Sequence, residues 1–336
     1  MVQIHNNYSL SAHNTFGLKV TAARFVAYDS ENDLRTFLIE KKLRSPFLHI
    51  GAGSNLLFTT DFYNGTVLHS DICGVHIIAE TSDDVRVRVG AGTVWDDFVT
   101  HCVRAGWYGV ENLSFVPGEV GASAVQNIGA YGVEAKDVID EVEGLHLDGT
   151  SFRMQAADCD YSYRHSIFKT PAYADTFITY VTYRLSKRPE YRLEYAALRD
   201  ELEGKPLSLA AVREIVGTIR RRKLPDPQVI GNAGSFFMNP VVTADRFEAL
   251  RADYPQIPHY CLPDGRVKIP AAWLIEQCGW KGKPYGRCAM YEKQSLVLVN
   301  LGDATGSDVV RLSDAVRASV RERFGIEIIP EVKFIS

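Results

Sequence analysis

The sequence lacks any long apolar run and any closely spaced pair of cysteines. No hydrophobic stretch approaches the ~18 residues that a membrane-spanning helix requires. The first fourteen residues are polar and contain no apolar signal core, so a cytoplasmic protein without a membrane partner is expected. The six cysteines show no CxxC pair and the nine histidines no HExxH spacing. We therefore expect reduced thiols, mostly buried, and no metal site.

An excess of positive charge is also missing. The 336 residues include 37 basic and 41 acidic side chains, for a net charge of −4. Such a balance provides no general surface for nucleic acid. Hydrophobic residues make up 46% and charged residues 23% of the chain, which is typical of a globular protein. The length exceeds what one core usually supports, so two or three domains are expected.

Hydrophobic periodicity predicts a mixture of strands and separate helices. Alternating or short apolar runs predict strands at 47–50 and 84–89, and a hairpin over 142–154 turning at Asp148-Gly149. Helical spacing predicts helices over 209–223, 270–278 and 307–324, and an extended tail follows over 326–335. This segregated pattern favours an α+β fold over an alternating α/β sheet.

The spacing of Thr93 and Asp96 resembles a variant capping box. It predicts a helix that opens at this point and runs through Arg104.

Two glycine-rich turns follow predicted strands, at 51–55 and 90–92. A Rossmann site requires a third glycine so that helix and strand can pack closely. That position holds Leu56 after the first turn and Trp95 after the second. The turns therefore do not indicate a Rossmann dinucleotide site.

The segment 117–132, PGEVGASAVQNIGAYG, combines four glycines with three alanines. So few side chains allow the backbone to approach a ligand closely, and successive N–H groups can bind anionic oxygens. A tight crossing of backbone inside a domain is the alternative. A serine hydrolase is disfavoured because Val125 stands where a nucleophile elbow needs glycine.

Three polar residues stand out in the remaining sequence. Ser235 lies between glycines and two phenylalanines, Arg164 lies among tyrosines, and Glu331 lies in the extended tail. Each also has a plain structural interpretation, as a turn residue, a stacked cation and a solvent-facing acid respectively. The basic run 220–223 fits either a solvated helix end or a phosphate contact.

Seven motifs in order resemble the UDP-N-acetylenolpyruvoylglucosamine reductase family, which consists of flavoenzymes of peptidoglycan precursor synthesis. These motifs are NTFG (14–17), GAGSNLLF (51–58), the 117–132 segment, YRHSIFK (163–169), KLPDP (223–227), GNAGSFFMNP (231–240) and PEVKFI (330–335). The resemblance implies an FAD-binding fold of the vanillyl-alcohol-oxidase/p-cresol-methylhydroxylase type plus a C-terminal α+β substrate-binding domain. The implied domains are 1–73 with 326–336, 74–224, and 225–325.

The resemblance also implies the activity. NADPH reduces non-covalently bound FAD, and the flavin then reduces the enolpyruvyl group of a UDP-sugar to give UDP-N-acetylmuramate. A cytoplasmic monomer acting in cell-wall biogenesis is expected. Two rival classes would be an oxidase of the same fold acting on another substrate and a non-catalytic nucleotide-binding protein.

By similarity to the family, Ser235 is the proton donor, and Arg164 and Glu331 polarise the substrate carboxylate. Tyr195 matches the loop tyrosine of the longer subtype. Further substrate contacts are expected at Lys223, Asn239 and Gln294. The expected FAD contacts are Gly51, Gly53, Ser54, Asn55, Gly118, Gly121, Ser123, Asn127, Gly129, Tyr131 and Gly132.

One departure from the family pattern lies close to the proposed acid. Met238 occupies a position where many relatives carry lysine. The resemblance therefore does not extend to one charged contact that those relatives would make near the substrate.

Overall fold

The computed structural model describes residues 1–336, which form two compact units. The first unit comprises Met1–Tyr8, Ala22–Ala52 and Asn64–Arg221, and the second comprises Ser9–Thr21, Gly53–Tyr63 and Arg222–Ser336. The chain contains both helices and strands, as the sequence predicts. The three-domain division implied by the resemblance has other bounds and stays a prediction.

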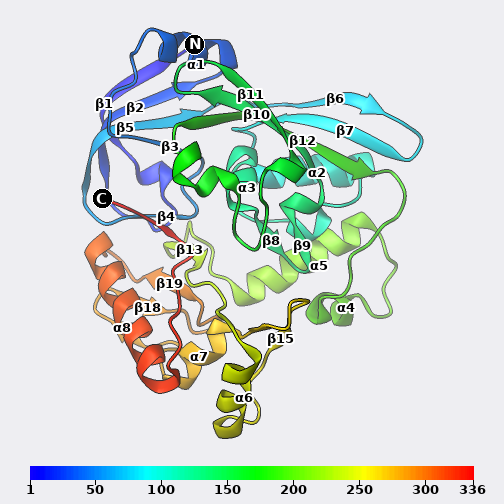
Figure 1. The fold of residues 1–336 in the computed structure, drawn as a ribbon, viewed down its shortest axis with the longest axis vertical. Helices are drawn as coiled ribbons and strands as arrows, with labels where there is room; N and C mark the ends of the chain where they lie inside the picture. The colour runs from blue at the N-terminus through cyan, green and yellow to red at the C-terminus, as the bar shows by residue number, and fades with distance from the viewer. The chain divides into compact units, whose positions relative to one another are not determined.

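The first unit is built on two sheets (Figure 1). One sheet has the order β1-β2-β5-β3 and the other the order β11-β10-β12-β7-β6. The strands of these sheets are β1 (Gln3–Ser9), β2 (Thr21–Tyr28), β3 (Phe47–Ile50), β5 (Phe62–Ser70), β6 (Val75–Glu80), β7 (Asp84–Gly90), β10 (Ile139–His146), β11 (Ser151–Gln155) and β12 (Thr176–Ser186).

Helices and a small hairpin complete this unit. The hairpin strands are β8 (Gly129–Ala130) and β9 (Val133–Glu134), and the helices are α1 (Glu31–Ile39), α2 (Trp95–Ala105), α3 (Val120–Gln126), α4 (Ala196–Leu202) and α5 (Leu209–Lys223). Short 3₁₀ turns occupy Glu111–Leu113, Ala135–Asp137, Ala156–Asp158, Ile167–Lys169 and Pro171–Tyr173.

Strand β12 is central to the five-stranded sheet and pairs antiparallel with both β10 and β7. The alternating valines of β7, Val85, Val87 and Val89, are all fully buried. They pack in one core with Trp95 and Phe98 of α2. The predicted strand at 84–89 and the predicted hairpin turning at Asp148-Gly149 are both confirmed.

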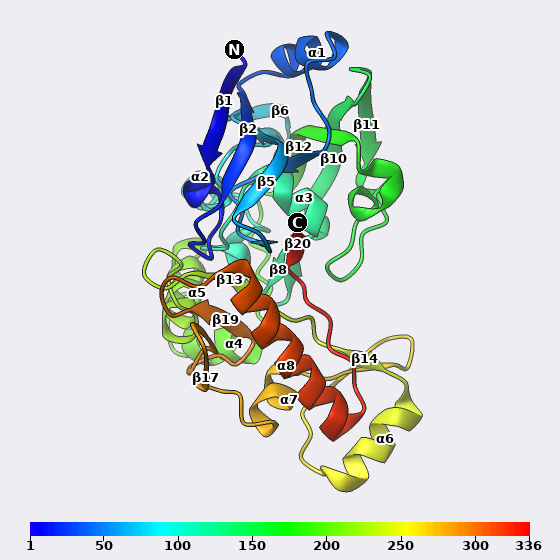
Figure 2. The same ribbon diagram turned by 90° about the vertical axis from the view of Figure 1, so that its left-hand side faces the viewer.

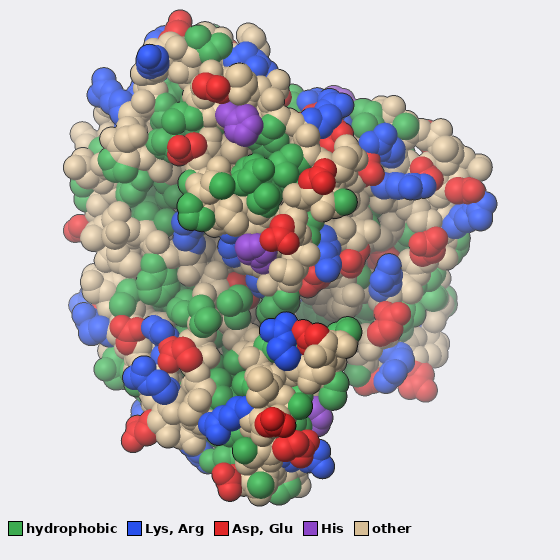
Figure 3. Space-filling model, viewed as in Figure 1, with side chains coloured by type: hydrophobic (Ala, Val, Ile, Leu, Met, Phe, Trp, Pro, Cys, Tyr) green, Lys and Arg blue, Asp and Glu red, His purple; other side chains and the backbone are tan.

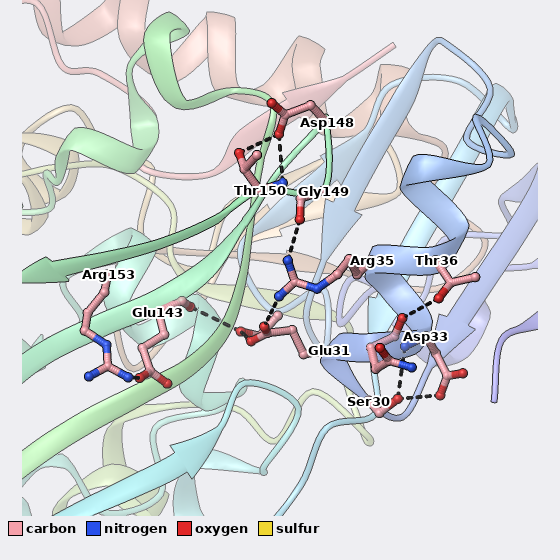
Figure 4. A network of polar contacts seen from close by, with 12 residues as sticks. Ser30, Glu31, Asp33, Arg35, Thr36, Glu143, Asp148, Gly149, Thr150 and Arg153 are labelled. Carbon is pink, nitrogen blue, oxygen red and sulfur yellow. Dashed lines mark hydrogen bonds and ion pairs between the residues drawn. The ribbon is translucent and has the colours of Figure 1, made fainter.

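A network of polar contacts ties α1 to the hairpin of β10 and β11 (Figure 4). Arg35 pairs with Glu31 at 2.6 Å on α1 and also donates to the Gly149 carbonyl at 2.6 Å. The Thr179 hydroxyl of β12 donates to the other Glu31 oxygen at 2.9 Å. These contacts fix α1 against the sheet although they join residues far apart in the sequence.

The predicted capping box at Thr93 is wrong. Helix α2 begins at Trp95, and its N-cap Val94 has no side-chain cap. Asp96 instead accepts both guanidinium nitrogens of Arg213 at 2.7 Å and the main-chain N–H of Phe115. A bidentate ion pair from a distant helix replaces the local cap because charge-assisted paired hydrogen bonds are the stronger interaction.

The second unit contains three small sheets. Their orders are β13-β19-β18-β17, β14-β16-β15 and the parallel pair β20-β4. The strands are β4 (Leu56–Phe58), β13 (Asn232–Ser235), β14 (Val241–Val242), β15 (Tyr260–Cys261), β16 (Val267–Lys268), β17 (Pro284–Tyr285), β18 (Cys288–Met290), β19 (Val297–Asn300) and β20 (Lys333–Ile335). The helices are α6 (Ala244–Asp253), α7 (Ala271–Gln277) and α8 (Gly306–Phe324), and a 3₁₀ turn covers Ser11–His13.

Helix α8 runs beside α7 (Figure 2). Thr305 and Asp308 form a reciprocal capping box at its start, and Gly325 closes it in the left-handed conformation at φ 60°. The apolar residues predicted to face the core, Val309 through Phe324 at helical spacing, are buried. The helix predicted over 307–324 is therefore confirmed, with one additional residue at its start.

All six cysteines are free thiols. Cys102, Cys159 and Cys288 are buried, whereas Cys73 and Cys261 are exposed, so the expected burial applies to half of them. No helix is both long and apolar enough to cross a membrane. Acidic and basic side chains are intermingled on the face shown in Figure 3.

Candidate active site

In the first unit, the turn at Gly51 packs against the start of α3. A β-carbon at Gly51 would lie 3.0 Å from Glu119 Oε2 and 3.4 Å from the Ala122 β-carbon. Residue 51 must therefore stay free of a side chain while Glu119 keeps this position. The segment 117–132, predicted only as exposed backbone, contains helix α3, which makes about two turns over Val120–Gln126.

The second glycine-rich turn, at 90–92, and the residue after it form hydrogen bonds with the start of α3. The N–H groups of Val120 and Gly121 donate to the carbonyls of Thr93 and Ala91 at 2.9 and 2.8 Å. A β-carbon on Gly121 would lie 2.9 Å from that of Ala91. For Gly121 the structure thus favours the tight backbone crossing, one of the two alternatives that the sequence left open.

Two predicted cofactor contacts have fully engaged side chains. The buried Ser123 hydroxyl donates to the Val120 carbonyl at 2.7 Å and lies 2.9 Å from the Tyr183 hydroxyl. The buried Asn127 amide donates to Ser162 and Glu134 and accepts the Lys136 N–H at 3.0 Å. These side chains stabilise the scaffold, so contact with a cofactor would have to come through their backbone.

Arg164 lies at the tip of a tight turn closed by mutual backbone hydrogen bonds between Ser162 and His165. Its φ of 56° is unusual for a residue with a β-carbon. Its guanidinium donates to the Gly129 carbonyl at 2.7 Å. A β-carbon on Gly129 would lie 2.9 Å from this guanidinium, so the glycine allows the arginine to lie along the backbone.

Tyr131 and Gly132 both adopt positive φ, 51° and 84°, between β8 and β9. Two consecutive left-handed residues are what a two-residue hairpin turn requires. The Tyr131 ring meets the Tyr195 ring edge to face, with centroids 5.2 Å apart. Burial raises the pKa of the Tyr131 hydroxyl, while its hydrogen bond with Arg220 acts in the opposite direction. Tyr195 itself is 38% exposed at the start of α4.

Asn112 connects two segments that carry predicted site residues, and the sequence analysis does not identify it. Its buried amide donates to the Tyr131 carbonyl at 2.8 Å and to the Arg192 carbonyl at 2.7 Å. One side chain therefore joins the glycine-rich segment to the loop that carries Tyr195. Nothing in the local sequence signals this role, because its partners are 19 and 80 residues away.

In the second unit, residues 53–55 are bound to neighbouring backbone. Gly53 has φ 68°, and a β-carbon there would lie 1.8 Å from the His13 carbonyl oxygen. Asn55 donates from its amide to the Glu331 carbonyl at 3.3 Å, and its own carbonyl accepts the Lys333 N–H at 3.0 Å. Ser54 lies between these two residues.

Ser235 ends β13 with its side chain exposed, directly before the buried Phe236 and Phe237. The Glu331 N–H donates to the Phe236 carbonyl at 2.8 Å, and the Met238 N–H donates to the Ile329 carbonyl at 2.9 Å. The chain after Ser235 thus runs antiparallel to the chain around Glu331. The structure brings these two predicted residues onto adjacent segments.

The remaining predicted substrate contacts also belong to the second unit. The Asn239 side-chain oxygen accepts the Ala271 N–H at 2.9 Å, at the start of α7. Gln294 accepts the Leu296 N–H at 3.3 Å, and Lys223 is the half-buried last residue of α5. Gly118, in the first unit, has φ 124°, and its carbonyl accepts the Trp95 N–H at 3.0 Å.

The residues present fit a flavin dinucleotide. Gly51 lies against Glu119 and Ala122 without a side chain of its own, and Gly118 adopts φ 124°, so neither residue covers its backbone with a side chain. A phosphate-bearing group needs such close approach to backbone. Gly51 and Gly118, together with the backbone around α3, would hold this part of FAD.

Comparisons with known proteins agree with these features. The family model for an FAD binding domain matches residues 22–155. The model for the UDP-N-acetylenolpyruvoylglucosamine reductase C-terminal domain matches residues 226–335.

Full-length relatives carry the same family name. The chain is 60% identical over 333 residues to the UDP-N-acetylenolpyruvoylglucosamine reductase of Bacteroides fragilis (strain YCH46), covering 99% of this chain and 100% of the relative. It is 48% identical over 338 residues to that of Porphyromonas gingivalis (strain ATCC 33277), with the same coverage. The crystal structure of the Thermus caldophilus enzyme matches with a TM-score of 0.70 at 22% identity, covering 100% of this chain and 99% of the other, which supports the fold. This chain belongs to the UDP-N-acetylenolpyruvoylglucosamine reductase family.

Proposed function

We propose that Ser235, Arg164 and Glu331 carry out the proton-transfer and charge-stabilising part of the family reaction in this chain. The enzyme is an FAD-dependent oxidoreductase of peptidoglycan precursor synthesis. It reduces the enolpyruvyl group of a UDP-sugar with NADPH as the electron source. Bound FAD would supply the hydride-transfer chemistry between NADPH and the enolpyruvyl double bond.

Ser235 is proposed as the proton donor. Hydride addition to one carbon of a double bond leaves negative charge on the neighbouring carbon, which must then be protonated. The Ser235 hydroxyl is exposed, whereas the next two side chains are buried and fix the backbone that carries it. A donor held on an ordered strand end can keep its oxygen at one place relative to the substrate.

Arg164 and Glu331 are proposed to stabilise the charge that develops on the substrate carboxylate. A guanidinium has a forked set of donors that matches a carboxylate, and its hydrogen bond to the Gly129 carbonyl fixes part of its orientation. The main chain of Glu331 is tied to Phe236, which restricts where its carboxyl group can reach. Preorganised polar groups of this kind account for much of the rate enhancement in enzymes.

The proposal extends to substrate binding. Tyr195, Lys223, Asn239 and Gln294 are proposed to contact the UDP-sugar, with Tyr195 on the loop that Asn112 anchors. The FAD contacts are proposed at the eleven positions that the family resemblance implies, with Ser123 and Asn127 contributing through backbone only. The enzyme is further proposed to work as a cytoplasmic monomer.

The observation that carries the proposal is the hydrogen bond between the main chains of Glu331 and Phe236, next to the exposed Ser235. An anaerobic absorbance spectrum of the purified protein tests the activity. The flavin bands should disappear on addition of NADPH and return on addition of the enolpyruvyl UDP-sugar. If the flavin is reoxidised only after oxygen is admitted, the protein is an oxidase. A protein that binds no FAD would overturn the proposal.

A further inference from the structure

A cluster of charged residues lies next to the Gly51 turn. His69 of β5 contacts two carboxylates, with Nδ1 2.9 Å from Asp71 Oδ1 and Nε2 3.0 Å from Glu119 Oε1. The side chains of His69 and Glu119 are only 12% and 9% exposed, while that of Asp71 is 50% exposed. Glu119 precedes α3 but makes no side-chain cap for that helix. Its carboxylate faces the histidine instead.

The geometry favours the doubly protonated form of His69. A neutral imidazole can donate from only one nitrogen, so one of the two carboxylate contacts would then lack a proton. Burial opposes the charge, but the hydrogen bond and charge of Glu119 and the charge of Asp71 outweigh it and raise the pKa of His69.

Other titratable groups surround this cluster. They are His49 from β3, whose pKa is lowered by burial and by the charge of His69, and Tyr28 and Cys73, whose pKa values are raised by burial and by Glu119 and Asp71. Each of these shifts favours the neutral form of the group. The ring of Phe25 from β2 stacks on His69 with centroids 6.2 Å apart. The two carboxylates are therefore the groups that bring negative charge to the imidazole.

The second oxygen of Glu119 faces the Gly51 turn. It is the atom 3.0 Å from the position of a β-carbon on Gly51. A carboxylate at this point would repel the phosphates of a dinucleotide held by the same turn. An adjacent cation removes most of that repulsion because the two charges nearly cancel at longer range.

We propose that His69 is a positioning residue for FAD, which as an imidazolium holds Glu119 in place and neutralises it beside the Gly51 turn. This inference rests on the proposed function only in taking FAD as the bound group. Asp71 accepts a hydrogen bond from the other ring nitrogen, Nδ1, and so helps to fix the orientation of the imidazolium. We call this arrangement of Asp71, His69 and Glu119 the charge relay. Affinity for FAD should then depend on the protonation state of His69, although His69 itself does not touch the cofactor.

Titration of the flavin-free protein with FAD, followed by quenching of flavin fluorescence, tests this directly. For the wild type, the dissociation constant should be constant at low pH and rise as His69 loses its proton. His69→Gln should weaken FAD binding about tenfold at pH 6.5 and remove this pH dependence, because glutamine donates a hydrogen bond without a charge.

The double variant H69Q/E119Q provides the critical comparison. Removing both charges should restore FAD binding to within about threefold of the wild type, since no unpaired carboxylate remains. Restoration of this kind is not expected if His69 only fills space. His76→Gln, an exposed histidine substitution on β6, is the matched control and should leave the dissociation constant unchanged.

An NMR titration of the His69 ring in the flavin-free protein provides a second readout, and its wild-type value does not depend on any variant folding. Its pKa should lie above the ordinary ~6.5, and Glu119→Gln should lower it. A His69 pKa below this value, or equal loss of FAD affinity in H69Q and H69Q/E119Q, would overturn the inference. If no FAD binds at any pH while His69 still titrates as expected, the proposed function fails and the charge relay stands.

Discussion

The Glu331 N–H donates to the Phe236 carbonyl at 2.8 Å. This single hydrogen bond joins the tail of the chain to the residue that follows Ser235. Phe236 is fully buried and meets Phe237 and Phe16 in edge-to-face contacts at 5.0 and 6.1 Å. The buried aromatic cluster therefore fixes the backbone next to Ser235, the proposed acid, and next to Glu331, which carries the proposed carboxyl group.

Ser235→Ala should separate the two halves of the reaction. Flavin reduction by NADPH should be nearly unchanged, because this step takes no proton from the side chain. Reoxidation by the enolpyruvyl substrate should slow by roughly 10²- to 10⁴-fold, the usual contribution of a positioned general acid. Stopped-flow absorbance of the bound flavin follows each half separately.

Ser235→Cys provides the control for this experiment. A thiol still carries a proton, so this variant should retain more reoxidation activity than the alanine variant. If alanine slowed both halves equally, Ser235 would be a structural residue at the end of β13.

Tyr195→Phe should weaken UDP-sugar binding by roughly 1 kcal/mol, the value of one hydrogen bond. The phenylalanine keeps the edge-to-face contact with Tyr131, so the loop should stay in place. Isothermal titration of the oxidised enzyme measures the change. Tyr285→Phe, at an exposed tyrosine that no motif assigns to the substrate, serves as the control. Equal affinities for wild type and Tyr195→Phe would remove Tyr195 from the site.

Local patterns in the sequence predict α8 and β7 well because their signals are complete within a few residues. The apolar spacing from Val309 to Phe324 and the stop at Gly325 both lie in one segment. The sequence does not predict helix α3, since its glycine, serine and valines offset the helix propensity of its two alanines and the segment has no apolar periodicity. It forms because Gly121 can pack directly on Ala91.

Long-range partners account for the other errors and omissions. The sequence pattern pairs Asp96 with a cap residue three positions away, but its partner Arg213 is 117 residues away. His69 and Glu119 are 50 residues apart. No sequence motif contains both residues, so their contact cannot be predicted from local spacing. Such pairs are set by the packing of strands and helices, which a single sequence does not display.

Gly53→Ala should destabilise the protein far more than Gly265→Ala. Both glycines have positive φ, 68° and 80°, where a β-carbon costs roughly 1–2 kcal/mol. At Gly53 the new carbon would also lie 1.8 Å from the His13 carbonyl oxygen, whereas at Gly265 nothing lies within 4 Å. We expect the difference in free energy of unfolding to exceed about 2 kcal/mol, the typical cost of an overpacked site. Urea unfolding of both variants checks this, and similar losses would contradict the close approach of Gly53 to His13.

His49 should make the protein less stable as the pH falls below 6.5. Its Nε2 lies 2.8 Å from the Tyr28 hydroxyl, and its ring packs against Phe177. Burial, together with the charge of His69, lowers the pKa of His49 from 6.5 to about 4. Between pH 6.5 and about pH 4, His49 is protonated in the unfolded chain but stays neutral in the folded protein. The free energy of unfolding therefore falls progressively as the pH is lowered through this range. The loss should reach about 2–3 kcal/mol at pH 4.

His49→Gln tests this sign directly, because glutamine can keep a hydrogen bond to Tyr28 but does not titrate. The fall in melting temperature between pH 7 and pH 4.5 should be smaller for His49→Gln than for the wild type, and His101→Gln should behave like the wild type.

His69 affects the stability in a different pH range. Because its folded pKa is raised, its contribution is complete below pH 6.5 and is lost as the pH rises through the folded value. An equal acid-induced fall in wild type and His49→Gln would show that His49 is not the group responsible.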